Sequence, residues 1–177
     1  PLCFAKYHMQ LADDIRNLAP VFGAIALEDI AAPRCFELEE SLQNIGIPVM
    51  HDDQHGTAVV VLAALLNACR VTGRRFSDLR VVVSGAGAAG YAIIRMLDGI
   101  GYRPGLFPEV ADIIVCDRAG ILHRHREGLY ANKYKFIMAE ETNRRGRIGS
   151  LADALAGADG LIGVSAPGIV TQEMVQS

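Results

Sequence analysis

The chain has 177 residues, enough to bury one hydrophobic core or slightly more than one. Its composition, 51% hydrophobic and 21% charged, excludes an intrinsically disordered protein. A net charge of −3 excludes a broad positive surface for nucleic acid. The longest apolar run, 58–66, is too short to span a bilayer, so it predicts a helix buried in a core and no membrane partner.

The first part of the chain predicts two short strands that each end at acidic residues. Residues 22–27 are apolar and lead into Glu28-Asp29, and residues 47–50 lead into His51-Asp52-Asp53. A helix is expected over 35–43, between the two strands. The next helix, over 57–70, is so apolar that we expect it to be covered on most sides.

The second part of the chain alternates strands with helices. The expected elements are strands at 79–83, 113–116 and 160–164, helices at 91–97, 134–141 and 151–155, and a loop or hairpin over 118–131. This order predicts βαβ units and therefore an α/β fold with a Rossmann-like, doubly wound parallel sheet. A seam near residues 54–58 would separate an acidic first domain, 1–55, from a nucleotide-binding domain, 56–177.

A glycine-rich turn connects the strand at 79–83 to the following helix. Its residues are Gly85, Ala86, Gly87, Ala88, Ala89 and Gly90, which fit the pattern Gly-x-Gly-x-x-Gly. The first glycine permits the tight turn, the second lets the backbone approach a pyrophosphate, and the third lets helix and strand close up. The helix N-terminus supplies unpaired N–H groups to the phosphates. We therefore predict a dinucleotide site here; the alternative is a tight turn without a ligand.

Asp117 ends the next strand and is the expected partner of the adenosine ribose. A carboxylate at this position accepts hydrogen bonds from ribose hydroxyls and favours NAD, whereas Arg118 beside it is suited to the 2′-phosphate of NADP. The choice between the two cofactors stays open. The spacing from Gly90 to Asp117 exceeds the usual ~20 residues, and a surface insertion over 99–108 accounts for the excess.

Glu28, Asp29 and Asp53 follow strands directly, and acids in that position project into the crevice where parallel sheets bind ligands. Three gathered carboxylates would repel one another unless a cation neutralised them. Mg²⁺ or Mn²⁺ suits such all-oxygen ligation. The alternative is that these acids cap helices or face solvent. His51 and His55 flank the second cluster, and we expect structural roles for them.

The remaining polar and sulfur-containing groups predict no further site. His123 and His125 are expected to face solvent, and residues 144–147 are expected to form a solvated basic loop. The four cysteines lie far apart, and three of them lie in or beside apolar segments, where a thiol behaves as a small hydrophobic group. No secretory signal is visible, so a reducing cytoplasmic setting is expected. The start at Pro1 suggests a piece of a longer protein.

Several segments of the chain together resemble bacterial-type malic enzymes from about residue 21 onward. They are FGAIALEDIAAPRCFELEE, IPVMHDDQHGTAVVVLAALLNA, VVVSGAGAAG, IIVCDRAG and GVSAPG. The pairing of LEDIAAPRCFE with HDDQHGTA is highly specific for that family. The resemblance implies that residues 1–55 end a smaller α/β domain that carries substrate and metal, and that residues 56–177 begin the NAD(P)-binding domain.

The resemblance also implies a reaction and its participants. The reaction is oxidative decarboxylation of L-malate to pyruvate and CO₂ with reduction of NAD⁺ or NADP⁺, in a homo-oligomer that uses Mg²⁺ or Mn²⁺. Glu28, Asp29 and Asp53 then correspond to metal ligands, with Asp52 as a neighbouring acid that tunes the site. The glycine turn corresponds to the pyrophosphate cradle, and residues 165–168 correspond to a loop close to the cofactor.

The family's catalytic tyrosine and lysine match no residue of this chain. Lys6 and Tyr7 lie only about 20 residues before Glu28 and lack the motif that surrounds the family's lysine, so neither receives that role. Ser84 replaces the asparagine usual in bacterial relatives. We therefore expect the isolated chain to be inactive. Two alternatives stay open: conversion of malate to lactate with tightly held NAD, and a nucleotide-binding module without catalytic activity.

Overall fold

The computed structural model describes residues 10–100 and 109–177. Cys3, Lys6 and Tyr7, and residues 101–108 of the expected insertion, lie outside the described residues.

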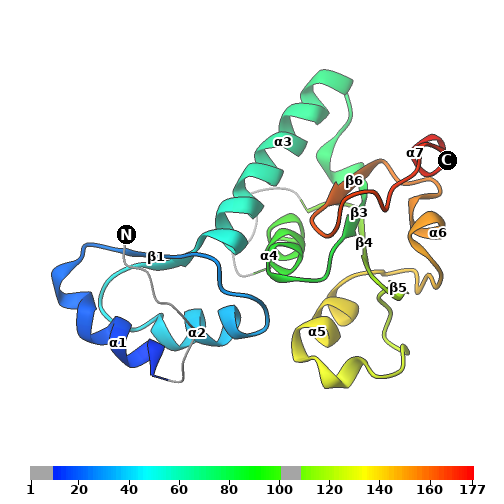
Figure 1. Ribbon diagram of the computed structural model, residues 1–177. Coiled ribbons are helices and arrows are strands. Elements are labelled where there is room, and N and C mark those ends of the chain that lie inside the picture. The colour runs from blue at the N-terminus through cyan, green and yellow to red at the C-terminus, as the bar shows by residue number, and fades with distance from the viewer. Residues whose placement is uncertain (1–9, 101–108) are drawn as a thin grey trace.

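The N-terminal unit contains two helices and a pair of parallel strands (Figure 1). Its elements are α1 (Leu11–Leu18), a 3₁₀ turn (Ala19–Val21), β1 (Ile25–Leu27), α2 (Arg34–Leu42) and β2 (Val49–His51). The strands pair in register, with Ile25 opposite Val49 and Leu27 opposite His51. A small core of Leu11, Ile15, Leu27, Leu38 and Leu42 holds the helices against this pair. Both strands are shorter than predicted, and α1 was not predicted.

A single continuous helical segment links this unit to the rest of the chain. It begins as a π-helical turn, η2 (Asp52–Gly56), and continues as α3 (Thr57–Thr72). Figure 1 shows α3 projecting from the body of the molecule. The prediction that this helix is covered on most sides is wrong, because Val59 and Val60 are 55% and 68% exposed. Only one face of α3, with Ala58, Leu62 and Cys69, packs into the core.

The helical segment is longer than the apolar run 58–66 that it contains. Of the described helices, one passes a length-and-composition test for a membrane span: Asp52–Thr72, with 21 residues and a mean hydropathy of 1.4. The sequence argument was therefore wrong about length, because it counted only the uninterrupted apolar residues. A single helix of this kind is weak support for a membrane span, since core helices pass the same test.

The second unit is built on a four-stranded sheet. Its strands are β3 (Arg80–Ser84), β4 (Asp112–Asp117), β5 (Gly120–Ile121) and β6 (Gly160–Gly163), in the order β5-β4-β3-β6. β3 is central and pairs in parallel with β4 and β6. β5 turns back on β4 as a short antiparallel hairpin. The region 118–131, predicted as a loop or hairpin, is thus a hairpin up to Ile121 and then a loop that ends in a 3₁₀ turn (Leu129–Ala131).

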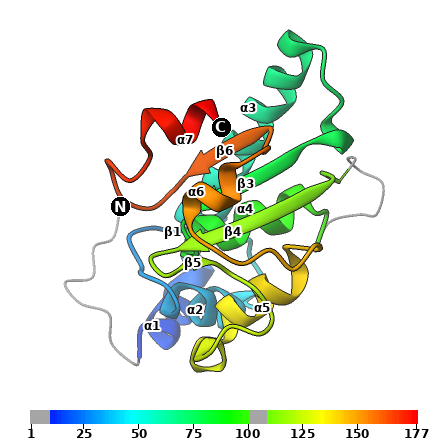
Figure 2. The ribbon, with the colours of Figure 1, turned by 90° about the vertical axis from the view of Figure 1, so that its right-hand side faces the viewer.

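Helices cover both faces of the sheet (Figure 2). α4 (Ala88–Leu97) and α5 (Lys133–Glu141) lie on one face, and α6 (Leu151–Leu155) and α7 (Gln172–Gln176) lie on the other. Successive side chains of a strand point to opposite faces. Val81 and Val83 accordingly join the core with α4, whereas Val82 packs with α6. The predicted α/β, Rossmann-like fold is confirmed.

Three aromatic rings connect the two units. Phe36 of α2 packs against Tyr91 of α4 and Tyr134 of α5, with ring centroids 5.0 and 4.0 Å away. The two tyrosine rings meet edge to face at 5.5 Å. Such contacts add about 0.5–1.5 kcal/mol each to the free energy of burial. They hold α2 against α4 and α5 of the second unit.

The prediction of a solvated basic loop over 144–147 is confirmed, since the segment has neither helix nor strand and Arg144, Arg145 and Gly146 are exposed. The loop is also held by hydrogen bonds: Arg144 donates to Asp98 Oδ1 at 2.5 Å and to Ala111 O at 3.3 Å, and Asn143 bridges Leu122 O and Arg147 O. The prediction that both histidines face solvent is correct for only one of them. His125 is exposed, but His123 is half-buried. The three cysteines in the described part, Cys35, Cys69 and Cys116, are buried free thiols, as predicted. Burial raises the pKa of Cys35 and of Cys116 to about 11, so neither is a ready nucleophile.

Candidate functional site

The glycine turn joins the central strand β3 to α4, and its three glycines differ in their steric surroundings. Gly85 has φ of +133°, and a Cβ there would lie 2.6 Å from Val164 O. A Cβ on Gly90 would clash with Gly85 O. Gly87 is different, because a Cβ there would have no heavy atom within 4 Å. The fold therefore requires Gly85 and Gly90, whereas Gly87 leaves open space next to the turn.

The open space faces the N-terminus of α4. Gly87 is the N-cap residue, and no side chain caps the helix there. Backbone N–H groups in the first turn of a helix lack intrahelical partners and carry partial positive charge. An uncapped helix end next to a position without a Cβ fits a pyrophosphate sterically and electrostatically. This geometry supports the cofactor role predicted for residues 85–90, which stays a prediction.

A second loop lies beside this turn. Residues 165–168 follow β6, and β6 pairs with β3, so the two loops emerge from neighbouring strands. Val164 N donates to Ser84 O at 2.9 Å, and the hydroxyls of Ser84 and Ser165 lie 3.2 Å apart. Ser84 therefore connects the two loops, through its backbone carbonyl and through its hydroxyl.

Asp117 lies at the end of β4, next to the turn: Gly85 N donates to the carbonyl oxygen of the preceding Cys116 at 2.8 Å. Its carboxylate already has three donors. Ala119 N binds Oδ1 at 2.9 Å, while Arg126 Nη2 and Lys135 Nζ bind Oδ2 at 2.9 and 2.6 Å. Burial alone would raise the pKa of Asp117, but the hydrogen bonds from Arg126 and Lys135 outweigh it and lower that pKa to about 2. The acid is ionised and paired.

Sequence reasoning missed Arg126 and Lys135. Arg118, the cation considered for a 2′-phosphate, is exposed. The cations that contact the Asp117 carboxylate come instead from positions 9 and 18 residues further along the chain. Because no local pattern links a strand end to a following loop and helix, the sequence carried no signal for this cluster.

The acidic residues lie at the carboxyl ends of β1 and β2, as predicted. The parallel register places Leu27 opposite His51, so Glu28-Asp29 and Asp52-Asp53 emerge side by side. Asp29 N donates to Asp53 Oδ2 at 3.0 Å. Asp29 has φ of +57°, in the left-handed region, which is unusual for a residue other than glycine. The contact holds the two strand ends together.

The acidic site has side chains of the kind that bind a divalent cation, but their arrangement does not form a complete binding site. Exposed carboxylates at one edge of a strand pair are the donors that Mg²⁺ and Mn²⁺ prefer. Within residues 10–100 and 109–177, however, no three His, Cys, Asp or Glu side chains gather closely enough to hold a metal ion. The structure brings Asp29 and Asp53 into contact and does not complete the set with Glu28. The assignment of Glu28, Asp29 and Asp53 as ligands stays a prediction.

Glu39 was not predicted to belong to the site, but it contacts the residues on either side of Asp52-Asp53. It is only 9% exposed. Its carboxylate accepts hydrogen bonds from His51 N at 3.0 Å and Gln54 Nε2 at 3.1 Å, and it pairs with His55 Nε2 at 2.8 Å. That hydrogen bond raises the pKa of His55. This contact supports the structural role predicted for His55, which stays a prediction. The signal was present in α2, where Glu39 lies three residues from both Phe36 and Leu42 on the buried face.

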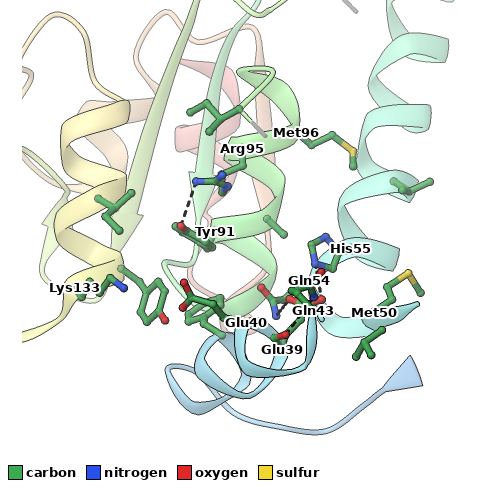
Figure 3. A pocket seen from close by; sticks show the side chains of 17 residues that line it. Glu39, Glu40, Gln43, Met50, Gln54, His55, Tyr91, Arg95, Met96 and Lys133 are labelled. Atoms are coloured by element: carbon green, nitrogen blue, oxygen red, sulfur yellow. Dashed lines mark hydrogen bonds and ion pairs between the residues drawn. The ribbon is translucent and has the colours of Figure 1, made fainter. Parts of the chain in front are cut away.

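This network forms one wall of a cavity of about 810 Å³ that runs along α4 (Figure 3). Figure 3 shows Glu39, Gln54 and His55 clustered at one end, with Tyr91 and Arg95 along the helix. Arg95 Nη1 donates to the Tyr91 hydroxyl at 3.3 Å. The cavity is lined by side chains of α2, β2, the π-helical turn, α4 and α5, so residues of both units contribute to it.

The family model described as "Malic enzyme, NAD binding domain" matches residues 54–177. The chain is 46% identical to the NAD-dependent malic enzyme of Geobacillus stearothermophilus over 99% of its own length and 35% of that protein. It is 45% identical to the bifunctional malic/malolactic enzyme of Bacillus subtilis over 95% of its length and 39% of that protein.

Solved structures give the same relationship. The crystal structure of the NAD-dependent malic enzyme from Thermotoga maritima is similar with a TM-score of 0.90 and 39% identity, over 99% of this chain and 45% of that one. The malic enzyme of Entamoeba histolytica gives 0.84 and 33%, over the whole of this chain and 38% of that one. The chain thus spans between about a third and a half of the length of these relatives.

Proposed function

This chain belongs to the malic enzyme family, and from that premise we propose that the protein containing it oxidatively decarboxylates L-malate to pyruvate and CO₂ while reducing NAD⁺ or NADP⁺. The observation that carries the proposal is the glycine turn, where only Gly87 has open space beside an uncapped helix N-terminus. The proposed domain division places residues 1–55 with substrate and metal and residues 56–177 with the nucleotide.

The residues of the turn have separate tasks in this proposal. Ala88, Ala89 and Gly90 present backbone N–H groups to the pyrophosphate, and Gly87 lets the phosphates come close. Asp117 and its two cationic partners lie at the adenosine ribose end. The nicotinamide, when bound, supplies the acceptor for a hydride from the substrate.

Glu28, Asp29 and Asp53 are the proposed ligands of Mg²⁺ or Mn²⁺. The bound cation would act as a Lewis acid toward the substrate's oxygens. The carboxylates must close around the ion when it binds, since the described side chains do not gather by themselves. The hydrogen bond from Asp29 N keeps Asp53 at the joint end of the two strands, and Glu39 fixes the backbone of His51 just before it.

No residue of this chain receives the role of catalytic acid or base, so we propose that the isolated chain is inactive. We further propose a cytoplasmic homo-oligomer that needs neither nucleic acid nor membrane. The net charge of −3 and the similarity to malic enzymes over nearly the whole chain support this proposal.

The test uses the full-length protein. Malate with Mn²⁺ and either nucleotide should produce reduced cofactor and pyruvate in equal amounts, and a chelator should abolish both. The product distinguishes the main proposal from the malolactic alternative, because the malolactic reaction yields lactate without net reduction of the cofactor. The Bacillus subtilis relative, a bifunctional malic/malolactic enzyme, is the reason to test this alternative. Nucleotide binding without consumption of malate would support the alternative of a nucleotide-binding module without catalytic activity, and it would refute the proposed activity.

A further inference from the structure

Three arginines from separate parts of the chain line one cavity at the amino ends of the sheet strands. The cavity has a volume of about 620 Å³. Arg74 comes two residues after α3, Arg80 begins β3, and Arg145 belongs to the basic loop between α5 and α6. The glycine turn follows the carboxyl end of β3, so the cavity and the proposed cofactor site lie at opposite edges of the sheet. The proposed reaction uses none of these three cations.

Asp159, directly before β6, orients two of the arginines. Its side chain is only 14% exposed. Oδ2 accepts hydrogen bonds from Arg80 N at 2.9 Å and from Arg80 Nε at 3.3 Å, and Oδ1 accepts one from Arg74 Nη1. The hydrogen bond from the Arg80 backbone lowers the pKa of Asp159, so the carboxylate is ionised. Because Arg80 uses Nε and Arg74 uses Nη1, both guanidinium groups keep terminal N–H donors for another acceptor.

Arg145 adds a positive charge that no acid neutralises. The neighbouring Arg144 donates to the carbonyl oxygen of Ala111, which also lines the cavity, so the loop is anchored at this edge of the sheet. The Arg145 side chain is exposed, and within residues 10–100 and 109–177 it makes no hydrogen bond or ion pair. Its guanidinium group is therefore available to a ligand.

The charges that line the cavity sum to a positive value. Three guanidinium groups face the single carboxylate of Asp159, which leaves two positive charges in excess. Arg75 and Asp78 also line the cavity, but they pair with each other at 2.8 Å and add no net charge. This excess contrasts with the net charge of −3 of the whole chain. Guanidinium groups bind carboxylate and phosphate oxygens through paired N–H groups, which makes the cavity suited to an anion.

We propose that this cavity binds a small anion with two or more phosphate or carboxylate groups, through Arg74, Arg80 and Arg145. More than one acidic group is required, because the cations come from three separate elements and their excess charge is two. The proposal does not depend on the proposed reaction, since no residue of the glycine turn or of the acidic strand ends lines the cavity.

The experiment measures binding of two probes to the full-length protein by isothermal titration calorimetry, in a buffer without divalent metal. The probes are inorganic pyrophosphate and propane-1,2,3-tricarboxylate, and the one that binds more tightly identifies phosphate or carboxylate as the preferred group. Arg145→Gln should weaken binding of that probe at least tenfold, which corresponds to about 1.4 kcal/mol. The melting temperature should not change, because the side chain is exposed and makes no contact within the described residues. Raising the salt concentration should weaken binding as well.

Two variants control for general loss of charge and for binding at the proposed cofactor site. Arg124→Gln removes one positive charge from an arginine that is 61% exposed and paired with Glu140, and it should leave the affinity unchanged. Gly87→Val, which crowds the glycine turn, should also leave it unchanged.

Arg145→Lys keeps the charge without the paired N–H groups, so its affinity should lie between those of Arg145→Gln and the unmodified protein. Failure of both probes to bind overturns the proposal, as does an equal effect of Arg145→Gln and Arg124→Gln. Loss of pyrophosphate binding in Gly87→Val, but not in Arg145→Gln, would place the anion at the glycine turn and would also overturn it. None of these results affects the proposed oxidation of malate.

Discussion

The backbone N–H of Asp29 donates a hydrogen bond to Oδ2 of Asp53, across 24 positions of sequence and at 3.0 Å. This contact joins the ends of the parallel strands β1 and β2. Because Asp53 accepts through one oxygen, an asparagine can keep the same hydrogen bond through its amide oxygen while losing the negative charge.

Asp53→Asn should therefore separate metal binding from folding. We expect the concentration of Mn²⁺ needed for half-maximal activity of the full-length protein to rise at least tenfold, while nucleotide affinity and melting temperature stay close to the unmodified values. Asp78→Asn, an exposed acid that pairs with Arg75, is the matched control. An unchanged Mn²⁺ requirement in Asp53→Asn would remove this residue from the ligand set.

Two glycines of the turn should respond in opposite ways. Gly87→Val places atoms in open space, so we expect nucleotide affinity to fall more than tenfold and the free energy of unfolding to change by less than about 1 kcal/mol. Gly90→Ala meets the Gly85 carbonyl, so it should destabilise the fold by about 1–3 kcal/mol. Calorimetric binding and denaturant unfolding measure the two effects. If Gly87→Val binds nucleotide normally, the pyrophosphate lies elsewhere.

The ion pairs of Asp117 should appear in the pH dependence of stability. The pKa of this group is lowered to about 2 in the folded chain, so its stabilising contribution is complete above the unfolded pKa of about 4 and is lost as pH falls from there through the folded pKa. A shift of about two units corresponds to about 2–3 kcal/mol. Urea unfolding of the unmodified protein and of Asp117→Asn should therefore differ most above pH 5 and converge toward pH 2. A difference that stays constant with pH would contradict the pairing.

Arg144 should contribute more to stability than its position in a basic surface run indicates. It bonds to Asp98 and Ala111, and its N–H donates to Asp112 Oδ1 at 3.3 Å. Since the side chain is 49% exposed, solvent screening limits the expected loss in Arg144→Ala to about 1 kcal/mol. Arg145→Ala, at the exposed neighbouring position, should lose less than about 0.5 kcal/mol. Equal melting temperatures for the two variants would show that the loop is not anchored through Arg144.

The helices and strands with clear periodicity were predictable, and the exceptions have physical reasons. The second-domain strands and helices occur within three residues of their expected ends, and the helix 151–155 has its predicted bounds. α7 was not predicted, and the π-helical turn before α3 is a rare geometry with i→i+5 hydrogen bonds that the apolar periodicity does not reveal. The exposure of Val60 could not be read from an apolar run, because a run shows how apolar a helix is and says nothing about what covers it.

By itself the sequence determined the family, the α/β class, the glycine turn and the acidic strand ends. Each of these depends on residue types at short spacings, where backbone geometry dictates the arrangement. Only the tertiary structure decided which groups meet: Asp29 with Asp53, Glu39 with His55, and Asp117 with Arg126 and Lys135. These contacts join separate elements and depend on how the elements pack, so no local pattern encodes them.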